Sequence, residues 1–463
     1  MISPSIFRVF RIAPVLAVLI FACAAAASTN HHVLLITVDG FAAYYLKDPA
    51  APLPTLRKLA SEGAVADGMK VANPSITWPN HTTLVTGVYP EKHSVFFNGV
   101  LQRAGTGLSV AVDPRRDKTD LVAVPTLYDL LHKNGYRTAG INWPCTRNSG
   151  TLDDDFPDVP DSITHSTPGL RDELVAAGIL KDKTDRSFGT QSAASRDQIW
   201  TTAAAHVIRA RKPNFMLIHM LITDGIQHRY GPRTPAALTA LAQADFQLRE
   251  ILTALDQAGI RDRTTLFILA DHGFETSTNI IHPNVLLRKH GLLDTNRVTG
   301  TPSVFKARAQ IVSEGGTALV YLLNPDTKQE DRAKVLQLFR ETEGIAQIIE
   351  PEGFAALGLP LPEKNLQMAD LILVPKPGHA FSNQAFGEEH ITPVTLTSGG
   401  LGNHGYLSSN TNMNAVFVAV GRGIKRGVKL GIIDNRDVAP TMAHLLGEKL
   451  PGADGKVLTE ILE

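Results

Sequence analysis

Net charge is absent from this chain, because 45 lysine and arginine residues balance 45 aspartate and glutamate residues. This balance argues against a protein whose main role is to coat nucleic acid or an anionic membrane, so no nucleic-acid-binding surface is expected. Internal repeats, heptad arrays and low-complexity tracts are also missing. The 463 residues, 43% of them hydrophobic, can bury a substantial core in one large domain or in two to three smaller ones.

No hydrophobic run near the N-terminus is long enough for a comfortable membrane span. The run Val15–Ala27 follows two arginines and ends in Ala25-Ala26-Ala27 before Ser28, the small-residue pattern of a signal-peptidase site. We therefore expect residues 1–27 to be a secretory signal peptide. Its removal would leave a secreted or periplasmic chain without a membrane span.

Cysteine is nearly absent as well, since Cys23 and Cys145 are the only two. Cleavage after Ala27 would leave Cys145 alone, so no intrachain disulfide could form even in an oxidising compartment. Stability then has to come from the hydrophobic core and from bound metal. Cys23 faintly matches a lipoprotein processing site, which keeps a lipid anchor as an alternative. Cys145 is expected to be a half-buried thiol without a catalytic role.

Apolar runs alternate with amphipathic stretches along the chain. Buried strands are predicted at His32–Val38, Tyr136–Asn142, Phe215–Thr223, Thr264–Ala270 and Ala415–Val420, and helices at Pro54–Gly63, Thr126–Gly135, Thr234–Gly259 and Val438–Leu446. This alternation predicts an α/β fold with a mostly parallel central sheet flanked by helices. Residues 276–400 have a different pattern, with strand-like runs at 318–323 and 369–374 and a helical stretch at 330–344. We expect an α+β insertion or cap there, within a single domain at 28–463.

A scattered set of three aspartates and three histidines carries the strongest chemical signal. Carboxylate oxygens and neutral imidazoles together are the ligands that Zn²⁺ takes in proteins. Six ligands exceed what one tetrahedral ion needs, so their number indicates two metal ions. Several directly follow predicted strands, and the carboxyl ends of parallel strands meet at one edge of a sheet. The six residues are Asp39, Asp224, His228, Asp271, His272 and His404.

Each of these motifs also has an ordinary explanation when taken alone. Asp271-His272-Gly273 can be a capped strand end, Asp224 can cap a helix, and a glycine-flanked histidine in a loop is usually solvated. The run of aspartates at 153–155 is interpreted as a solvated loop, with a Ca²⁺ site as the alternative. Structural or ligand-supporting roles are assigned to the remaining motif histidines, which are His81, His93 and His219.

Thr77 offers a hydroxyl group in an unusual local sequence, Ser75-Ile76-Thr77-Trp78-Pro79-Asn80-His81. Pro79 is suited to the first turn of a helix that runs through Thr86, so the Thr77 hydroxyl is expected near a helix N-terminus, where anions are favoured. Metal coordination could make this hydroxyl a nucleophile. Asn98, before a glycine, is either a turn residue or a donor to a substrate oxygen.

These motifs, in this order, resemble the nucleotide pyrophosphatase/phosphodiesterase family of the alkaline phosphatase superfamily. The resemblance runs over nearly the whole mature chain, through Val33–Phe41, Thr77–His81, Thr86–His93, Asn98, Asn142–Pro144, Asp224–Pro232, Asp271–Gly273 and His404. It implies an alkaline-phosphatase-like catalytic domain and a metal-dependent phosphodiesterase or nucleotide pyrophosphatase that acts on small-molecule phosphodiesters.

The resemblance also implies a two-zinc site, other divalent metals being possible. Asp224, His228 and His404 would hold one ion. The other would be held by Asp39, Asp271, His272 and the Thr77 oxygen. Thr77 would attack phosphorus and become phosphorylated or nucleotidylated, Asn98 would hydrogen-bond a non-bridging oxygen, and Trp78 would offer an aromatic face to a flat substrate group.

Departures from the family pattern leave the substrate open. Gln227, His219 and Cys145 replace a glycine, a base-stacking tyrosine and a glycine that family members commonly carry. A phosphomonoesterase or phosphonoacetate-type hydrolase with the same site is the first alternative, with Arg147 or Arg115-Arg116 supplying extra positive charge. A sulfatase would need Cys/Ser-x-Pro-x-Arg near residue 77, and a phosphoglycerate-mutase-type enzyme fits neither the threonine nor the signal peptide. A non-catalytic extracellular binding module would not need the full ligand set.

Overall fold

An eight-stranded sheet forms the centre of the larger of two lobes in the computed structural model, which describes residues 30–298 and 301–463. The strand order is β21-β2-β20-β8-β1-β7-β5-β6. The bounds are β1 His32–Val38, β2 Ala64–Lys70, β5 Thr138–Pro144, β6 Asp154–Asp158, β7 Phe215–Met220, β8 Thr264–Leu269, β20 Phe417–Gly421 and β21 Val428–Asp434. All neighbouring pairs are parallel except those of β20, which runs antiparallel to both β8 and β2. The predicted α/β class with a mostly parallel sheet is therefore confirmed.

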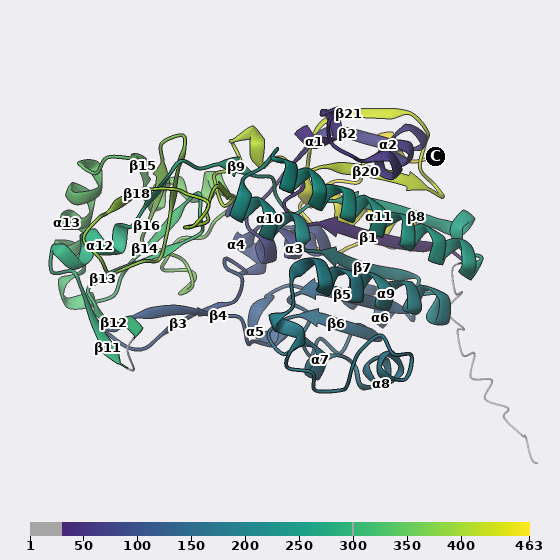
Figure 1. The fold of residues 1–463 in the computed structure, drawn as a ribbon, viewed down its shortest axis with the longest axis horizontal. Coiled ribbons are helices and arrows are strands. Elements are labelled where there is room, and N and C mark those ends of the chain that lie inside the picture. Colours follow the sequence, from purple (N-terminus) through teal and green to yellow (C-terminus); the bar gives the residue numbers. More distant parts are fainter. Residues whose placement is uncertain (1–29, 299–300) are drawn as a thin grey trace, which may run out of the picture.

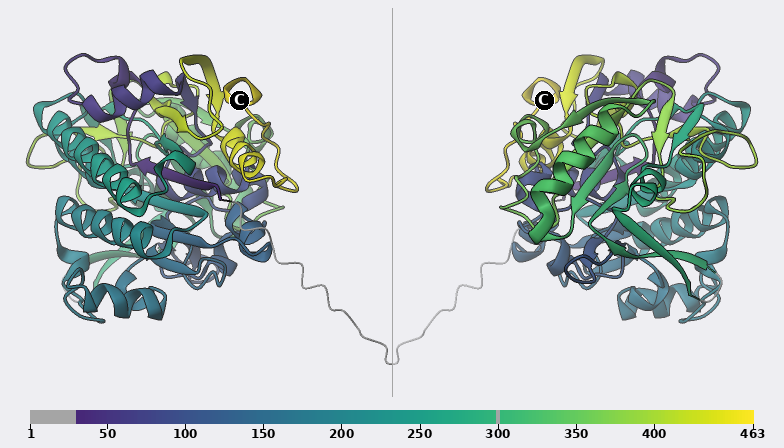
Figure 2. Two further views of the ribbon diagram at one scale, coloured as in Figure 1. Left: turned by 90° about the vertical axis from the view of Figure 1, so that its right-hand side faces the viewer. Right: turned by 90° about the vertical axis from the view of Figure 1, so that its left-hand side faces the viewer.

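Helices cover both faces of this sheet (Figure 2). One layer contains α2 Pro54–Glu62, α9 Ala193–Arg211 and α11 Pro235–Ala258, and the other contains α3 Thr77–Thr86, α6 Leu127–Lys133 and α14 Val438–Leu445. Helix α11 begins at the Thr234 cap, whose hydroxyl accepts from the Ala237 N–H, and ends at Gly259 in the left-handed region. Its leucine-rich stripe packs into the main hydrophobic core. No helix in the described ranges is both long and apolar enough to cross a bilayer.

A second lobe lies beside the first and has its own hydrophobic core (Figure 1). Its main sheet has the order β13-β14-β16-β15 and is antiparallel throughout, with bounds β13 Ala309–Ser313, β14 Ala318–Leu322, β15 Ile345–Ile349 and β16 Leu371–Pro375. Helices α12 Pro283–Lys289 and α13 Lys328–Arg340 pack on it. Smaller sheets pair β11 Leu293–Val298 with β12 Thr301–Ala307, and β10 Asn279–Ile281 with β17 His379–Phe381 and β18 Ile391–Pro393.

This second core also takes side chains from outside residues 276–400. Phe96, Phe97, Leu101 and Val110 belong to it. The hairpin of β3 Val100–Arg103 and β4 Val110–Asp113 extends from the larger lobe toward the smaller one (Figure 1). The smaller lobe is thus built from two separate segments of the chain.

The interpretation of residues 153–155 as a solvated loop is wrong. Asp154 and Asp155 are only 3% exposed and begin β6, the edge strand of the sheet. Arg137 and Arg211 pair with Asp154. The Asp155 carboxylate accepts from the Thr146 hydroxyl, and the Asp155 backbone N–H donates to the Thr167 hydroxyl. Among the described residues, no group of three or more possible metal ligands includes this run, so the structure gives no support to the Ca²⁺ alternative.

The second lobe leaves and rejoins the first at the carboxyl edge of the sheet. Strand β9, Glu275–Thr276, follows β8 and pairs antiparallel with β19, Gly402–Asn403. His404 directly follows β19. The pairing therefore brings His404 to the edge of the sheet at which β1 and β8 also end.

Candidate metal centre and active site

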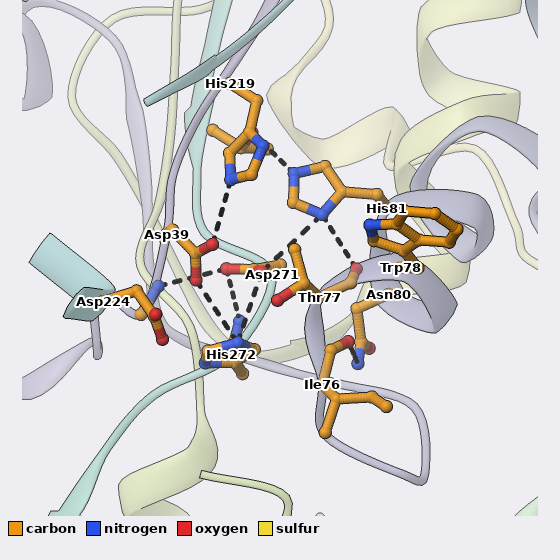
Figure 3. A network of polar contacts seen from close by, with 12 residues as sticks. Asp39, Ile76, Thr77, Trp78, Asn80, His81, His219, Asp224, Asp271 and His272 are labelled. Atoms are coloured by element: carbon orange, nitrogen blue, oxygen red, sulfur yellow. Dashed lines mark hydrogen bonds and ion pairs between the residues drawn. The ribbon is translucent and has the colours of Figure 1, made fainter. Parts of the chain in front are cut away.

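Asp39, Asp271 and His272 form a compact group where β1 and β8 end (Figure 3). The Nε2 atom of His272 lies 3.3 Å from Oδ1 of Asp39 and 3.3 Å from Oδ2 of Asp271. The other oxygen of Asp271 accepts from the backbone N–H groups of Gly40 and His272. These three side chains are buried, and the atoms that face one another have no hydrogen-bond partner in the described structure.

Asp224, His228 and His404 form a second group next to the first. Asp224 lies in the first turn of α10, Ile222–Tyr230, rather than directly after a strand, and His228 follows one turn later. Oδ1 of Asp224 lies 3.3 Å from Nε2 of His228 and 3.5 Å from Nε2 of His404. The imidazole rings of His404 and His272 stack at 3.7 Å, so the two groups touch.

The three histidines share one hydrogen-bonding pattern. Each Nδ1 lies beside a backbone carbonyl oxygen, that of Gly273 for His272 (3.2 Å), of Gly402 for His228 (3.0 Å) and of Ser75 for His404 (3.1 Å). A carbonyl only accepts, so each Nδ1 carries the hydrogen and donates. The lone pair of every neutral ring is then on Nε2, which faces the carboxylates. A carbonyl that fixes the tautomer in this way is typical of metal-ligating histidines.

Two glycines let the backbone approach closely beside these ligands. A Cβ atom on Gly273 would lie 1.9 Å from the carbonyl oxygen of Asn412, and one on Gly405 would lie 1.7 Å from that of Glu314. Gly405 also has a φ of +82°. Larger residues at these positions would displace the neighbouring His272 and His404.

The carboxylates of the first group are held in an environment that disfavours their negative charge. Burial, together with the charges of Asp271 and Asp224, raises the pKa of Asp39 well above its usual range. Burial raises the pKa of Asp271 to about 6 and lowers that of His272 to about 4. The pKa of Asp224 is lowered, because His228 and His404 outweigh the effect of burial. Cations among these residues would remove the repulsion between the carboxylates.

The donor set fits divalent cations of the zinc type. Buried oxygens and Nε2 atoms without partners converge in two adjacent groups, and hard carboxylates mixed with imidazoles suit Zn²⁺ and related ions. His81, His219 and Asp271 also lie close together. His81 is less suited to hold an ion, because Nδ1 bonds to the Thr77 carbonyl and Nε2 to the Thr37 hydroxyl, both at 2.8 Å.

Thr77 is the first residue of α3, and Ile76 before it is extended. Its hydroxyl has no hydrogen-bond partner among the described residues, and Figure 3 shows the side chain between His81 and the group of Asp39 and His272. The helix N-terminus adds a positive potential at this point. A hydroxyl placed in this way is available to a ligand.

Asn98 is oriented by the residue that follows Thr77. Its Oδ1 accepts from the backbone N–H of Trp78 at 2.9 Å. The Nδ2 hydrogens of Asn98 therefore remain available to donate to a ligand. The structure thus brings together all the residues that the sequence singled out for the site.

A cavity of about 440 Å³ opens beside Trp78 and Asn98. The indole Nε1 of Trp78 donates to Oδ2 of Asp158 at 3.1 Å, and Asn142 and Trp200 line other parts of the wall. Asp158 was not singled out from the sequence. It ends β6, and its position at the carboxyl end of a strand could have been recognised had 153–155 been interpreted as the start of that strand.

Three residues at which the chain departs from the family pattern do not line this cavity. His219 is fully buried in β7, Gln227 is 1% exposed and Cys145 is 2% exposed. The Gln227 amide donates to the Gly40 carbonyl and accepts from the Tyr45 hydroxyl. The prediction that Cys145 is half-buried is wrong, because Cys145 is buried in a small hydrophobic cluster that includes Trp78. These substitutions change the packing behind the site and do not contribute to its surface.

A family model described as type I phosphodiesterase / nucleotide pyrophosphatase matches residues 33–407. The chain is 24% identical over 419 residues to venom phosphodiesterase 2 of Crotalus adamanteus, and the aligned region covers 89% of this chain and 45% of that protein. It is 23% identical over 416 residues to ectonucleotide pyrophosphatase/phosphodiesterase family member 1 of Mus musculus, covering 89% of this chain and 40% of the relative. The chain spans less than half the length of these relatives.

Solved structures share the fold. Murine ectonucleotide pyrophosphatase / phosphodiesterase 5 superposes with a TM-score of 0.66 at 17% identity, covering 93% of this chain and 100% of that one. An inactive threonine-to-alanine variant of the murine protein, in complex with AMP, gives a TM-score of 0.65 at 16% identity, with 94% and 100% covered. At these identities the likeness establishes the α/β architecture.

Proposed function

The chain belongs to the type I phosphodiesterase / nucleotide pyrophosphatase family, and we propose that it is a metal-dependent phosphodiesterase. Thr77 would be the nucleophile, and two divalent cations, with Zn²⁺ favoured, would bind beside it. The observation that carries the proposal is the convergence of buried, unpartnered ligand atoms beside a free hydroxyl. Asp39, Asp271 and His272 contribute such atoms on one side, and Asp224 on the other.

The proposed ligand sets follow the two groups of side chains. Asp39, Asp271, His272 and the Thr77 oxygen would hold one ion, and Asp224, His228 and His404 the other. When bound, such ions lower the pKa of a nearby hydroxyl or water and offset negative charge on phosphoryl oxygens. The carbonyl contacts of the three histidines would leave each Nε2 free to bind an ion.

Thr77 would carry out the first chemical step. Its hydroxyl loses a proton to solvent, and Oγ1 attacks phosphorus opposite the leaving group. The new Oγ1–P bond forms as the bond to the leaving oxygen breaks, giving a phosphorylated or nucleotidylated Thr77. In the second step water attacks the same phosphorus and the Oγ1–P bond breaks, which restores the hydroxyl.

Two features of the chain would stabilise the negative charge that develops in these steps. The Asn98 amide can donate to a non-bridging oxygen, since its own oxygen is held by the Trp78 N–H. The N-terminus of α3 adds a positive electrostatic potential beside Thr77. The relative that is inactive after a threonine-to-alanine change and binds AMP supports both the nucleophile and a nucleotide substrate.

A phosphomonoesterase is less well supported. Two of the arginines that could supply extra positive charge are engaged elsewhere, because Arg147 pairs with Asp117 at 2.8 Å and Arg116 with Asp113 at 3.1 Å. The largest electrostatic influences on the site aspartates are other aspartates and histidines. A phosphonoacetate-type hydrolase would use the same residues. The intact ligand set and the free Thr77 hydroxyl weigh against a non-catalytic binding module.

We also propose that the protein acts outside the cytoplasm. The relatives include proteins named as venom phosphodiesterases and ectonucleotide pyrophosphatases. The proposed signal peptide at 1–27, with the Cys23 lipid-anchor alternative, lies outside the described residues. Residues 276–400 are proposed to cap the active site, within a single catalytic unit at 28–463.

The test compares three substrates with and without chelator. Purified protein is given bis(p-nitrophenyl) phosphate, p-nitrophenyl phosphate and phosphonoacetate. Chelator-sensitive turnover that is fastest with the diester supports the proposal. Faster turnover of the monoester or of phosphonoacetate would replace it with the corresponding alternative, and no turnover of any of the three would favour the binding module.

A further inference from the structure

The cavity beside Trp78 contains charges that the metal centre does not use. Asp158 and Arg196 both line it, from β6 and α9 respectively. They influence each other electrostatically, but no ion pair joins them, and within the described residues neither side chain pairs with any other charged group. An acid and a base that share a cavity without pairing are available to a ligand.

Asp158 has one oxygen committed and one available. Oδ2 accepts from the Trp78 indole, and this is the only hydrogen bond that the side chain makes among the described residues. Asp158 ends the edge strand of the sheet, on the same side as Asp39, and its charge contributes to the raised pKa of Asp39. The free oxygen is therefore an acceptor close to the metal centre.

Arg196 and Trp200 both line the same cavity. Nε of Arg196 and Nε1 of Trp200 are enclosed and have no acceptor, and the guanidinium lies 5.4 Å from the indole centroid. Trp200 and Phe188 pack edge to face at 5.4 Å. The cavity thus combines flat apolar walls with one acceptor and at least one charged donor.

We propose that Asp158 and Arg196 determine substrate specificity by hydrogen-bonding the edge of one flat, uncharged ring on the substrate. Asp158 accepts from a ring N–H, and Arg196 donates to a ring carbonyl or nitrogen. This inference rests on the proposed phosphodiesterase function. A volume of about 440 Å³ accommodates a ring with its sugar or a similar linker. An uncharged ring with donor and acceptor on one edge satisfies both residues, whereas a cation leaves Arg196 unpaired and an anion is repelled by Asp158.

The experiment measures kcat and KM for three chromogenic diesters. The p-nitrophenyl ester of thymidine 5′-phosphate has a ring with donor and acceptors, bis(p-nitrophenyl) phosphate has a flat ring without an N–H, and p-nitrophenylphosphorylcholine has a cation. The variants are Asp158→Asn, which turns the free acceptor into a donor, Arg196→Gln and the double variant. Asp120→Asn, at an exposed position of α5 Lys118–Leu121, is the control.

Each single variant is expected to lower the kcat/KM ratio of the thymidine ester to the bis ester by about 10- to 100-fold, mainly through KM, because a charged group loses its hydrogen-bond partner. In the double variant the losses should not add, since both residues contact one ring. An unchanged kcat/KM ratio in Arg196→Gln would overturn the proposal. This variant provides a test even if Asp158→Asn does not fold.

Two further results of this experiment would have a different meaning from an unchanged kcat/KM ratio. A selective loss of the choline ester in Asp158→Asn would show that the cavity takes a cation, and would overturn the ring assignment. Failure of the unaltered protein to hydrolyse any of the three diesters would refute the phosphodiesterase function itself.

Discussion

His219 Nε2 lies 3.0 Å from Oδ2 of Asp39, on the oxygen that does not face His272. One oxygen of the Asp39 carboxylate, Oδ2, therefore contacts His219, and the other, Oδ1, faces the proposed metal centre. The other nitrogen of His219, Nδ1, lies 3.1 Å from the Asn142 carbonyl, so the ring is fixed at both ends. His219 thus holds the oxygen of a proposed metal ligand that points away from His272.

Replacement of His219 by alanine is expected to weaken metal binding by about 10- to 100-fold, because partners of metal ligands typically contribute that much. The measurement is a competition titration with a chromogenic chelator, together with kcat at saturating metal. His444→Ala, at an exposed position in the last turn of α14, is the matched control. Unchanged metal affinity in His219→Ala would show that Asp39 needs no such support.

Replacement of Thr77 by alanine is expected to abolish diester turnover, with a loss of at least about 1000-fold in kcat. Metal content should remain, because three protein ligands of the proposed ion are untouched. Thr77→Ser keeps a hydroxyl and should recover part of the rate. Mass spectrometry of quenched reactions should find a phosphoryl or nucleotidyl adduct on Thr77 in the unaltered protein alone. Substantial activity of the alanine variant would refute the nucleophile.

Elemental analysis of the metal-loaded protein is expected to find two ions per chain. His404→Ala should retain only one firmly, because Asp224 and His228 alone make an incomplete site. Chelation should also lower the melting temperature, since it leaves unpartnered buried oxygens of Asp39, Asp224 and Asp271. A single ion in the unaltered protein would contradict the two-metal scheme.

His93 is expected to make the fold sensitive to acid. Nδ1 accepts from the Val95 N–H, and Nε2 donates to the Thr83 hydroxyl, so the neutral ring is fully satisfied. Burial lowers the pKa of His93 to about 3, against 6.5 in the unfolded chain. Its contribution to stability is therefore present above pH 6.5 and is lost as the pH falls toward 3, by at most about 1.4 kcal/mol per pH unit.

The measurement compares the free energy of unfolding at pH 7.5 and pH 5 in the unaltered protein and in His93→Gln. The glutamine variant should lose less stability on acidification, because its amide cannot be protonated in this range. His444→Gln, at an exposed position, should behave as the unaltered protein does. An identical pH dependence in all three would contradict the assignment.

Cys145 is expected to be inert toward alkylating reagents. The thiol is 2% exposed, and burial raises its pKa to about 12, so the reactive thiolate is absent at pH 8. Incubation with iodoacetamide followed by intact-mass analysis should show no modification of Cys145 in the folded protein and full modification in denaturant. Rapid labelling of the folded protein would mean that the hydrophobic cluster of Cys145 and Trp78 opens.

The ligand-bearing residues could be predicted because their signals are local. Asp39 and Asp271 follow apolar runs that can only be buried strands, and the sheet then brings them together. Asp224 is spaced from His228 by one helical turn, although it lies inside a helix and not at a strand end. His404 had no such local signal, and its position depends on the pairing of β9 with β19.

The cavity could not be predicted in the same way. Asp154 was assigned to solvent, yet it is buried because Arg137 and Arg211 meet it from distant parts of the chain. That error concealed the strand that ends at Asp158. Arg196 comes from α9, whose sequence gives no sign that its guanidinium would lack a partner. Such residues are defined only by tertiary packing, which local patterns do not report.

The pairing of Thr276 with Gly402 has a consequence for the protein's evolution and engineering. The chain departs into the smaller lobe and returns from it at adjacent positions, so the intervening residues can lengthen, shorten or be exchanged while the two anchor points stay fixed. A grafted segment would keep His272 and His404 facing each other only if it replaced the Gly316 N–H that donates to the His404 carbonyl. The proposed ligands should therefore tolerate changes in the parts of this segment that lie away from residues 314–317.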